Sequence, residues 1–409
     1  MRLFARTTIK LHPLVLSSIG FVLTIVVAGC GGGGPEGRGA PIPPVNAGPT
    51  ASAAPTPTAT SNFAEFIVPS AKSSLVGLTP GPDGNVWFTE GTSLKVGYVT
   101  PTGTVSEFNV ASISPTAGVS VGNIASGQGQ TLWFAYTGTQ GSSTTSYLYQ
   151  VSTSATMLTN ANETSCIAPG QCYSVTVLEP GPSGNVIAGD VLYASSSSGG
   201  LNTILQELSA AGQLAAFDNT PSNGTQGILD DVVATTGQAW ASWQLYGLGG
   251  PPSSPAITAI ATSGTLTAYQ LPGTYQPGNG AVPVAGQTSS DLPYSTSQDL
   301  TIGADGAPWI ALNGGPGSAL GRIASDGSIA LHVVSSANVQ IAGITTGSDG
   351  ALWFTEAATN KIGRMTTSGT LTEYPVPTAN AGLGRIVAGP NNTLWFTEVW
   401  ANKIGRYTY

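Results

Sequence analysis

Three glutamates recur at the end of the same four-residue sequence and are the first candidates for chemistry. Trp-Phe-Thr-Glu ends at Glu90, Glu356 and Glu398. Carboxylate oxygens are the ligands that hard cations such as Mg²⁺ and Ca²⁺ prefer. If the three side chains converge at one mouth of a channel, they predict a divalent-cation site. The alternative is that each glutamate pairs with a nearby base, and the neighbouring bases are Lys95, Lys361, Arg364, Lys403 and Arg406.

The first cysteine, Cys30, follows a segment with the features of an export signal. Residues 1–29 have a basic start, an apolar run from Leu14 to Ala28 and a small-residue end. This pattern resembles a bacterial lipobox, which implies cleavage before Cys30, acylation of its thiol and a lipid anchor in the membrane. We expect an extracytoplasmic protein, on the outer membrane if the source has two membranes. A single transmembrane helix over Leu14–Gly29 is the alternative.

The other two cysteines, Cys166 and Cys172, lie close together in a polar stretch. An exported protein meets an oxidising environment, so the spacing predicts a small disulfide loop. Metal binding is the weaker interpretation, because a structural zinc site needs four ligands and no His lies nearby.

Composition limits the class of protein. The chain has 55 Gly and 29 Pro among 409 residues, and a formal net charge of −8. Residues 30–61 are rich in Gly, Pro, Ala and Thr and predict a tether without a core. The remaining chain, 62–409, is too apolar for disorder and too rich in turn residues for a helical bundle. Its few basic residues argue against a nucleic-acid partner, and we expect a monomer.

Internal repetition predicts the fold. Three segments agree closely, at 81–108, 347–377 and 389–409, and each has a turn, a strand ending in Trp-Phe-Thr-Glu, a polar loop and a second strand. Another alternating strand follows, and a short apolar strand precedes each turn, which makes four strands per unit. Weaker copies fill the middle of the chain. The aligned positions are Trp87, Trp133, Ile187, Trp240, Trp309, Trp353 and Trp395.

Seven units of this size predict an all-β, seven-bladed β-propeller of four-stranded blades. The last unit stops after its third strand, and residues 63–69 match the missing fourth strand. We therefore expect the N-terminal strand to close the last blade and remove the open edge. The tryptophans should pack between neighbouring blades. A β-helix is the alternative fold, but its repeats are much shorter.

The repeated string Asp-Gly-x-Leu-Trp-Phe-Thr-Glu, followed by Asn-Lys-Ile-Gly-Arg and Thr-Glu-Tyr-Pro, resembles the virginiamycin B (streptogramin B) lyase family of seven-bladed propellers. The match is close in 340–409, good in 75–110 and diluted elsewhere. The resemblance implies a Mg²⁺-assisted carbon–oxygen lyase that opens a cyclic depsipeptide antibiotic. It also implies a His before the Gly-Ile that opens a blade, a carboxylate two residues ahead of it, and the Glu of the next Trp-Phe-x-Glu.

The family's histidines are missing from this sequence. The corresponding positions are Val76, Gly122, Thr176, Gln298, Ala342 and Gly384, and the fourth unit cannot be aligned. Beyond the leader the only histidine is His332, at the place of Glu373 in an outermost strand. Abstraction of a proton next to a carbonyl needs a base that titrates near neutral pH, which His normally supplies.

Two functions remain. The first is a membrane-anchored binding module whose channel mouth or loops hold an envelope or extracellular ligand or protein. The second is a metal-dependent lyase with an unusual base. Asp230, Asp231 and Asp299 could line the channel, although isolated acids in a repeat protein are more often on exposed turns. Loss of every family His favours the binding module.

Overall fold

The computed structural model describes residues 50–52, 62–110, 117–140, 143–161, 172–181, 186–193, 202–208, 214–218, 226–235, 238–246, 252–261, 266–270, 294–314, 317–335 and 339–409. Cys30, Cys166 and the side chain of Cys172 lie outside this part of the chain, so the predicted lipid anchor and disulfide rest on sequence alone. All regular elements in these ranges are β-strands. No helix in the same ranges is long and apolar enough to cross a membrane.

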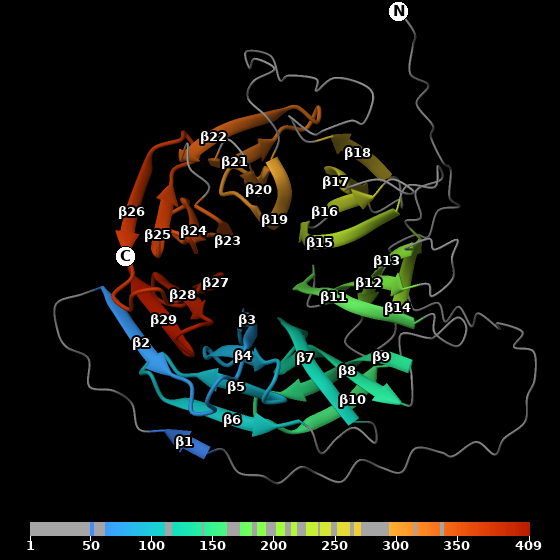
Figure 1. Cartoon of the computed structure of the whole chain (residues 1–409), viewed down its shortest axis with the longest axis vertical. Helices are drawn as coiled ribbons and strands as arrows, with labels where there is room; N and C mark the ends of the chain where they lie inside the picture. The colour runs from blue at the N-terminus through green and yellow to red at the C-terminus, as the bar shows by residue number, and fades with distance from the viewer. Residues whose placement is uncertain are drawn as a thin grey trace, which may run out of the picture.

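The strands form seven antiparallel sheets arranged as blades around a central axis (Figure 1). The innermost strands contact one another in a closed cycle, in the order β3, β7, β11, β15, β19, β23, β27 and back to β3. The predicted seven-bladed β-propeller is therefore confirmed.

The blades are named here in chain order. Blade 1 contains β3 (Leu75–Pro80), β4 (Val86–Glu90), β5 (Lys95–Val99) and β6 (Val105–Asn109). Blade 2 contains β7 (Ala117–Ser126), β8 (Thr131–Gln140), β9 (Ser143–Ser152) and β10 (Met157–Ala161). Blade 3 contains β11 (Cys172–Pro180), β12 (Val186–Tyr193), β13 (Asn202–Leu208) and β14 (Leu214–Asp218). Blade 4 contains β15 (Gln226–Thr235), β16 (Gln238–Tyr246), β17 (Pro252–Ala261) and β18 (Leu266–Gln270).

The remaining blades include the closely repeated units. Blade 5 contains β19 (Tyr294–Ile302), β20 (Pro308–Gly314), β21 (Gly317–Ile323) and β22 (Ile329–Ser335). Blade 6 contains β23 (Ile341–Thr346), β24 (Leu352–Glu356), β25 (Lys361–Met365) and β26 (Leu371–Pro375). Blade 7 contains β27 (Leu383–Gly389), β28 (Thr393–Glu398), β29 (Lys403–Thr408) and the N-terminal strand β2 (Phe63–Ile67).

Strand β2 closes the ring as predicted. It pairs antiparallel with β29, in a register that runs from Phe63 opposite Tyr407 to Ile67 opposite Lys403. The strand is two residues shorter than the predicted 63–69, and the next backbone amide, of Val68, donates to the carbonyl of Asn402 at 3.1 Å. Blade 1 also has a fifth, outer strand, β1 (Thr50–Ser52), which pairs with β6. These three residues lie within the segment that the composition predicts to be a tether.

The repeated tryptophans fill the spaces between blades, as predicted. Trp87 packs with Val121 and Ile124 of blade 2, and Trp353 packs with Ile386 of blade 7. Trp395 of blade 7 packs against Leu78 of blade 1, in the same way. The joint that β2 completes therefore has the same kind of apolar core as the joints between blades that follow one another in the chain.

Every innermost strand departs from regular pairing at the same place. The pairing with the second strand shifts within Leu75–Leu78, Val121–Ile124, Val175–Val177, Leu229–Asp231, Ser297–Leu300, Ile341–Gly343 and Leu383–Ile386. Such β-bulges re-aim side chains and are common beside functional sites. They make a ring of seven irregular positions around the axis.

Candidate functional site

The three glutamates of the Trp-Phe-Thr-Glu repeats end the second strands of blades 1, 6 and 7. Each lies opposite the lysine that begins the third strand, in the pairs Glu90–Lys95, Glu356–Lys361 and Glu398–Lys403. All three glutamates have 0% of their surface exposed. They are components of the blade interior and do not line an open channel mouth.

The lysines bind a different glutamate, on the outermost strand of the same blade. Lys95 Nζ lies 2.7 Å from Glu107 Oε2. The equivalent distances are 2.6 Å between Lys361 and Glu373 and 2.9 Å between Lys403 and Glu65. Both carboxylate oxygens of Glu90 and of Glu398, and Oε1 of Glu356, have no hydrogen-bond partner among the described residues.

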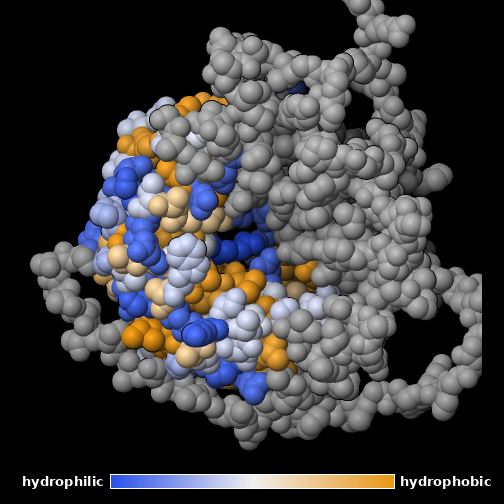
Figure 2. All heavy atoms as spheres, viewed as in Figure 1, coloured by the Kyte–Doolittle hydropathy of each residue, from blue (hydrophilic) through white to orange (hydrophobic). Residues whose placement is uncertain are grey.

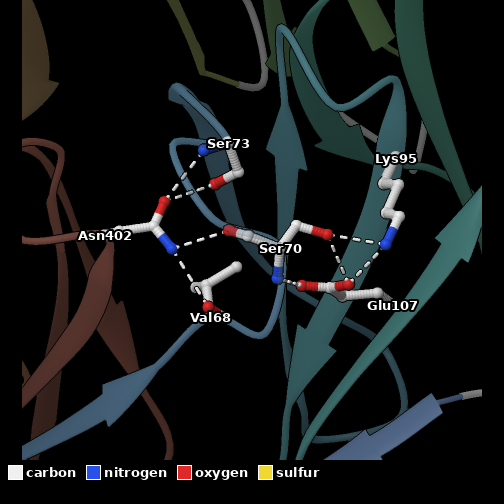
Figure 3. Close-up of polar contacts among 6 residues, drawn as sticks. All are labelled: Val68, Ser70, Ser73, Lys95, Glu107 and Asn402. Atoms are coloured by element: carbon white, nitrogen blue, oxygen red, sulfur yellow. Dashed lines mark hydrogen bonds and ion pairs between the residues drawn. The ribbon is translucent and has the colours of Figure 1, made fainter.

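The outer glutamate and its lysine hold the segment that enters from the preceding blade (Figure 3). Glu107 accepts hydrogen bonds from the backbone N–H and the hydroxyl of Ser70, both at 2.8 Å. From the other side, Asn402 Nδ2 donates to the carbonyls of Val68 and Ser70, and Asn402 Oδ1 accepts from Ser73. Asn402 has a φ of 56°, a left-handed conformation that Asn tolerates well. This set of contacts is called the blade 7/1 clamp below.

The same clamp joins blades 6 and 7. Glu65 accepts hydrogen bonds from the backbone N–H and the hydroxyl of Thr378, at 2.9 and 2.6 Å. Asn360 donates to the carbonyls of Val376 and Thr378 and accepts from the N–H of Ala381. The Asn-Lys pair that begins Asn-Lys-Ile-Gly-Arg, together with a glutamate on the outermost strand, thus forms a joint between blades.

Burial favours the protonated form of the three glutamates. Burial, followed by the nearby charge of Glu107, raises the pKa of Glu90 to about 8. Burial and the charge of Glu65 raise the pKa of Glu398 to about 8 as well, and burial raises the pKa of Glu356. Burial opposes ionisation of Glu107 too, but hydrogen bonds from Lys95 and Ser70 outweigh it and lower the pKa of Glu107. In blade 1 the inner carboxyl, Glu90, is therefore neutral at pH 7 and the outer one, Glu107, is charged.

A second set of charged side chains lies at the axis of the ring, on the innermost strands. Arg385 Nη1 of blade 7 is 2.7 Å from Glu179 Oε1 of blade 3 and 3.7 Å from Asp299 Oδ1 of blade 5. These side chains are 12–21% exposed, so solvent in the channel reaches them. Asp231 of blade 4 completes the set, which is called the axial cluster below. Hydrophilic atoms gather at the centre of the ring in Figure 2.

The pairing register places three of these residues at one equivalent position. Leu300 opposes Ile310, one residue after Trp309, just as Leu78 opposes Phe88 after Trp87. Asp299 therefore occupies the place that Gly77 has in blade 1. The same alignment places Asp231 and Arg385 there in blades 4 and 7. This position follows the bulge on each inner strand, and in blade 6 it is also a glycine, Gly343.

Backbone amides of the next blade fix the two aspartates. Asp231 Oδ2 accepts from the N–H of Leu300 at 2.7 Å, and Asp299 Oδ2 accepts from the N–H of Ile344 at 3.1 Å. Asp231 is 2% exposed, and its Oδ1 has no hydrogen-bond partner among the described residues. The carboxylates are held rigidly, and one buried oxygen is left unsatisfied.

Electrostatics in the axial cluster are dominated by burial and by excess negative charge. Burial, partly offset by Arg385, raises the pKa of Glu179 to about 7. Burial and the charges of Asp299 and Glu179 raise the pKa of Asp231 well above its usual range. Burial alone would lower the pKa of Arg385, but the surrounding carboxylates together raise it, so the guanidinium stays charged.

Comparison with known proteins agrees with the repeat. Residues 256–409 match the model of the Virginiamycin B lyase family. A streptogramin B lyase structure superposes with a TM-score of 0.58 at 23% identity, over 84% of this chain and 96% of the other. Residues 256–409 are therefore similar to this family. Virginiamycin B lyase from Staphylococcus aureus superposes with a TM-score of 0.60 at 21% identity, over 85% and 99% of the two chains.

The shared architecture extends to propellers of other kinds. The WD40 β-propeller domain of Doa1 gives a TM-score of 0.56 at 10% identity, over 85% of this chain and 98% of that one. No curated protein sequence matches the chain. At these identities the solved structures establish the fold alone, and the chemistry has to be argued from the residues of this lyase-like chain.

The positions at which the family has histidine are the bulge residues of the inner strands. They are Val76, Gly122, Thr176, Gln298, Ala342 and Gly384. The pairing register also identifies the equivalent residue in blade 4, which could not be aligned from the sequence. It is Asp230, which lies between the paired residues Leu229 and Asp231. No histidine occupies this ring in the lyase-like chain.

His332 lies on the outermost strand β22, as predicted, but at a different register. It opposes Leu320, and the equivalent pair in blade 6 is Tyr374 with Ile362, so His332 replaces Tyr374 and not Glu373. Its ring packs 5.0 Å from that of Trp309. Burial, and then Arg322, lower the pKa of His332. It is a packing residue of the outer edge.

The Mg²⁺ that the family resemblance implies does not fit the side chains present. The described residues contain no group of three or more His, Cys, Asp and Glu side chains that could hold a metal ion. Glu90, Glu356 and Glu398 lie in separate blades, each beside its own lysine. At the axis the carboxylates already hold a guanidinium. Cation binding by the three glutamates stays a prediction that this arrangement does not favour.

Sequence reasoning found part of the axial cluster. Asp231 and Asp299 were recognised as channel candidates, but the expectation that such acids lie on exposed turns is wrong for Asp231, which is 2% exposed. Glu179 and Arg385 were missed. A signal for Arg385 was present, since it stands where the repeat has glycine in Gly77 and Gly343.

Proposed function

We propose that this protein is a membrane-anchored, extracytoplasmic β-propeller that binds a ligand or protein partner at its channel, without the lyase reaction of the family. The observation that carries the proposal is the ion pair between Arg385 and Glu179, 2.7 Å across the axis. It presents fixed charges in a channel that solvent reaches, and such preorganised polar groups are typical of binding sites.

The groups that a lyase would need are missing, buried or already paired, and this supports the same proposal. The bulge positions carry no histidine, so the family's base is missing. Glu356 and Glu398 are fully buried and cannot touch a substrate without opening their blades. Glu179 is engaged by Arg385, and a carboxylate held in an ion pair is a weakened base.

One observation favours the second candidate, a lyase-like enzyme with a carboxylate base. The pKa of Glu179 is raised to about 7, which suits a general base at neutral pH. Glu179 is also partly exposed to the channel. If the reaction survives in this chain, Glu179 is the residue on which it would depend.

Mass spectrometry of a streptogramin B antibiotic incubated with the full chain and Mg²⁺ distinguishes the two. We expect the antibiotic to be unchanged, with the wild type and with Glu179→Gln and Glu356→Gln/Glu398→Gln variants. A ring-opened product that forms with the wild type and disappears with Glu179→Gln would overturn the binding-module proposal. A product lost only with the double variant would instead point to the buried glutamates.

The location is part of the proposal and has its own test. A lipid on Cys30 would hold the propeller at a membrane through the Gly- and Pro-rich segment 31–61. We expect the wild type in the membrane fraction and a Cys30→Ser variant released or retained as an unprocessed precursor. Membrane association with an unmodified Cys30, seen by intact-mass analysis, would favour a spanning helix.

A further inference from the structure

We propose that the axial cluster is a binding site for an organic cation, a ligand that carries an ammonium or guanidinium group. This inference rests on the proposed binding function and names its ligand class. The cluster contains three carboxyl groups, Glu179, Asp231 and Asp299, and one base, Arg385. Carboxyl groups outnumber bases, so a second cation would stabilise their ionised forms and is the complementary ligand.

An unsatisfied buried oxygen points the same way. Asp231 is more than nine-tenths buried, and its Oδ1 has no partner among the described residues. The groups that act on this carboxyl are Asp299, Glu179 and Arg385, so it faces the cluster. A buried polar atom without a partner is costly, and native structures rarely keep one without a functional reason. A cation among these carboxylates would satisfy it.

Asp299, the carboxylate next to Asp231 in the axial cluster, can also take part in binding the cation. Arg385 binds Glu179 at 2.7 Å but is 3.7 Å from Asp299, so the guanidinium does not satisfy both acids equally. Asp299 Oδ1 is therefore held less closely by Arg385 than Glu179 is, while Oδ2 accepts a hydrogen bond from the N–H of Ile344. The aspartates cannot swing away from a ligand, because each is fixed to the backbone of the next blade.

An exposed aromatic side chain lies on the same blade as Arg385. Trp400, 77% exposed, belongs to the loop that follows β28 in blade 7. Its indole lies over Gly382, where φ is 68° and a Cβ would clash with the ring. Gly382 precedes Arg385 by three residues in the sequence. An exposed indole offers a face to the apolar or cationic part of a ligand.

Three carboxylates in a metal-binding geometry are absent from the described residues, which also argues against a metal ion here. Binding of a cation should displace protons, because neighbouring positive charge favours the ionised form of a carboxyl group. Proton release is a readout that adventitious surface binding would not share.

Isothermal titration calorimetry of the full chain in detergent tests the site, with agmatine as the probe. We expect saturable binding near pH 7 whose heat depends on the ionisation enthalpy of the buffer. Glu179→Gln should weaken binding at least tenfold. Asp231→Asn keeps an acceptor for the Leu300 N–H but should reduce the buffer dependence, because only Glu179 can then release a proton. Trp400→Ala should weaken binding about threefold, and the exposed Asp326→Asn should leave it unchanged.

Several outcomes would overturn the inference. They are absence of agmatine binding to the folded wild type, equal affinity in the melting-verified Glu179→Gln variant, or saturable binding of succinate or Ca²⁺ in place of agmatine. The antibiotic assay is independent of these results. A ring-opened product without agmatine binding would remove both proposals, whereas agmatine binding together with an unchanged antibiotic would support both.

Discussion

Blades 6, 7 and 1 and blades 3, 4 and 5 are built from the same repeat but use it differently. In the first group the Glu and Lys positions are kept, and blades 6 and 7 also keep the Asn, so that clamps join blade 6 to blade 7 and blade 7 to blade 1. In the second group those positions are lost, and single acids stand on the inner strands instead. Where the repeat sequence is regular it encodes the scaffold. Where the repeat sequence is altered, charged side chains of the inner strands lie at the axis of the ring.

Blade 7 belongs to both groups. Lys403 and Asn402 make its clamps, and Arg385 provides the only cation of the axial cluster. The difference between the groups therefore predicts different responses to mutation. Changes in the clamps should alter stability, and changes at the axis should alter both binding and the dependence of stability on pH.

The largest effect is expected from the apolar core between blades 6 and 7. Trp353→Ala should destabilise the protein by about 3–5 kcal/mol, because a fully buried indole leaves a cavity. Thermal and denaturant unfolding would measure the loss. Trp400→Ala is the matched control, since Trp400 is 77% exposed and its loss should change stability little. Equal effects of the two variants would contradict the packing between blades.

The next effect concerns the axis. Arg385→Leu leaves Glu179, Asp231 and Asp299 facing one another without their cation, at a cost of about 3 kcal/mol at pH 8. The loss should shrink at pH 5, where protonation relieves the repulsion. The double variant Arg385→Leu/Glu179→Gln should recover part of the stability at pH 8. A loss independent of pH would mean that Arg385 acts through packing alone.

The clamps should respond alike at the two joints. Asn402→Gly removes the side-chain hydrogen bonds to Val68, Ser70 and Ser73 but keeps the left-handed backbone, and we expect a loss of about 2 kcal/mol. Asn360→Gly makes the same change at the blade 6/7 joint. Similar midpoints in chemical unfolding would show that ring closure is as strong as an internal joint. A much larger loss for Asn402→Gly would make closure the weak point.

The smallest effect expected is a difference in pH dependence between Glu90 and Glu107, the two carboxyls beside Lys95 in blade 1. Glu90 has a pKa raised to about 8 in the folded state, so stability is greatest at acidic pH and falls as pH rises toward 8. Glu90→Gln should remove this slope and make the variant more stable than the wild type at pH 8.5. Melting temperatures between pH 5 and pH 9 would show it.

Glu107→Gln is the control for that comparison, with the opposite sign. The pKa of Glu107 is lowered, so its contribution is present at neutral pH and is lost as pH falls through this lowered pKa. This variant should be less stable at pH 7 because Lys95 loses its partner. A stabilised Glu107→Gln or a destabilised Glu90→Gln at pH 8.5 would reverse the assignment of the neutral and charged carboxyls.

The fold could be predicted because the internal repeats indicate both the strands of each blade and the way in which the ring closes. The spacing of the tryptophans indicated the blades, and the similarity of 63–69 to the fourth strand of another unit indicated β2. The clamps could not be predicted in detail. A cross-strand lysine is the obvious partner of Glu90, but Glu107 competes for it from the outer strand, where it opposes Gly97.

The axial cluster was harder to predict for a geometric reason. Each inner strand contains a bulge, so counting residues from the tryptophan does not tell which side chain meets the next blade. Glu179 and Arg385 are 2.7 Å apart yet lie in blades 3 and 7, and nothing in the local sequence of either one specifies the other. Only the curvature of the closed ring brings them together.

Closure by β2 also sets an order of events for folding. Glu65 and Lys403 meet although they are 338 residues apart, so the first strand of the ring to leave the ribosome is the last to find its partner. Until β29 exists, Phe63–Ile67 is an unpaired apolar segment. Contacts of such long range slow folding and leave strand edges open to other chains. A chain of this design therefore keeps an open strand edge until its two ends pair, and that pairing completes the ring.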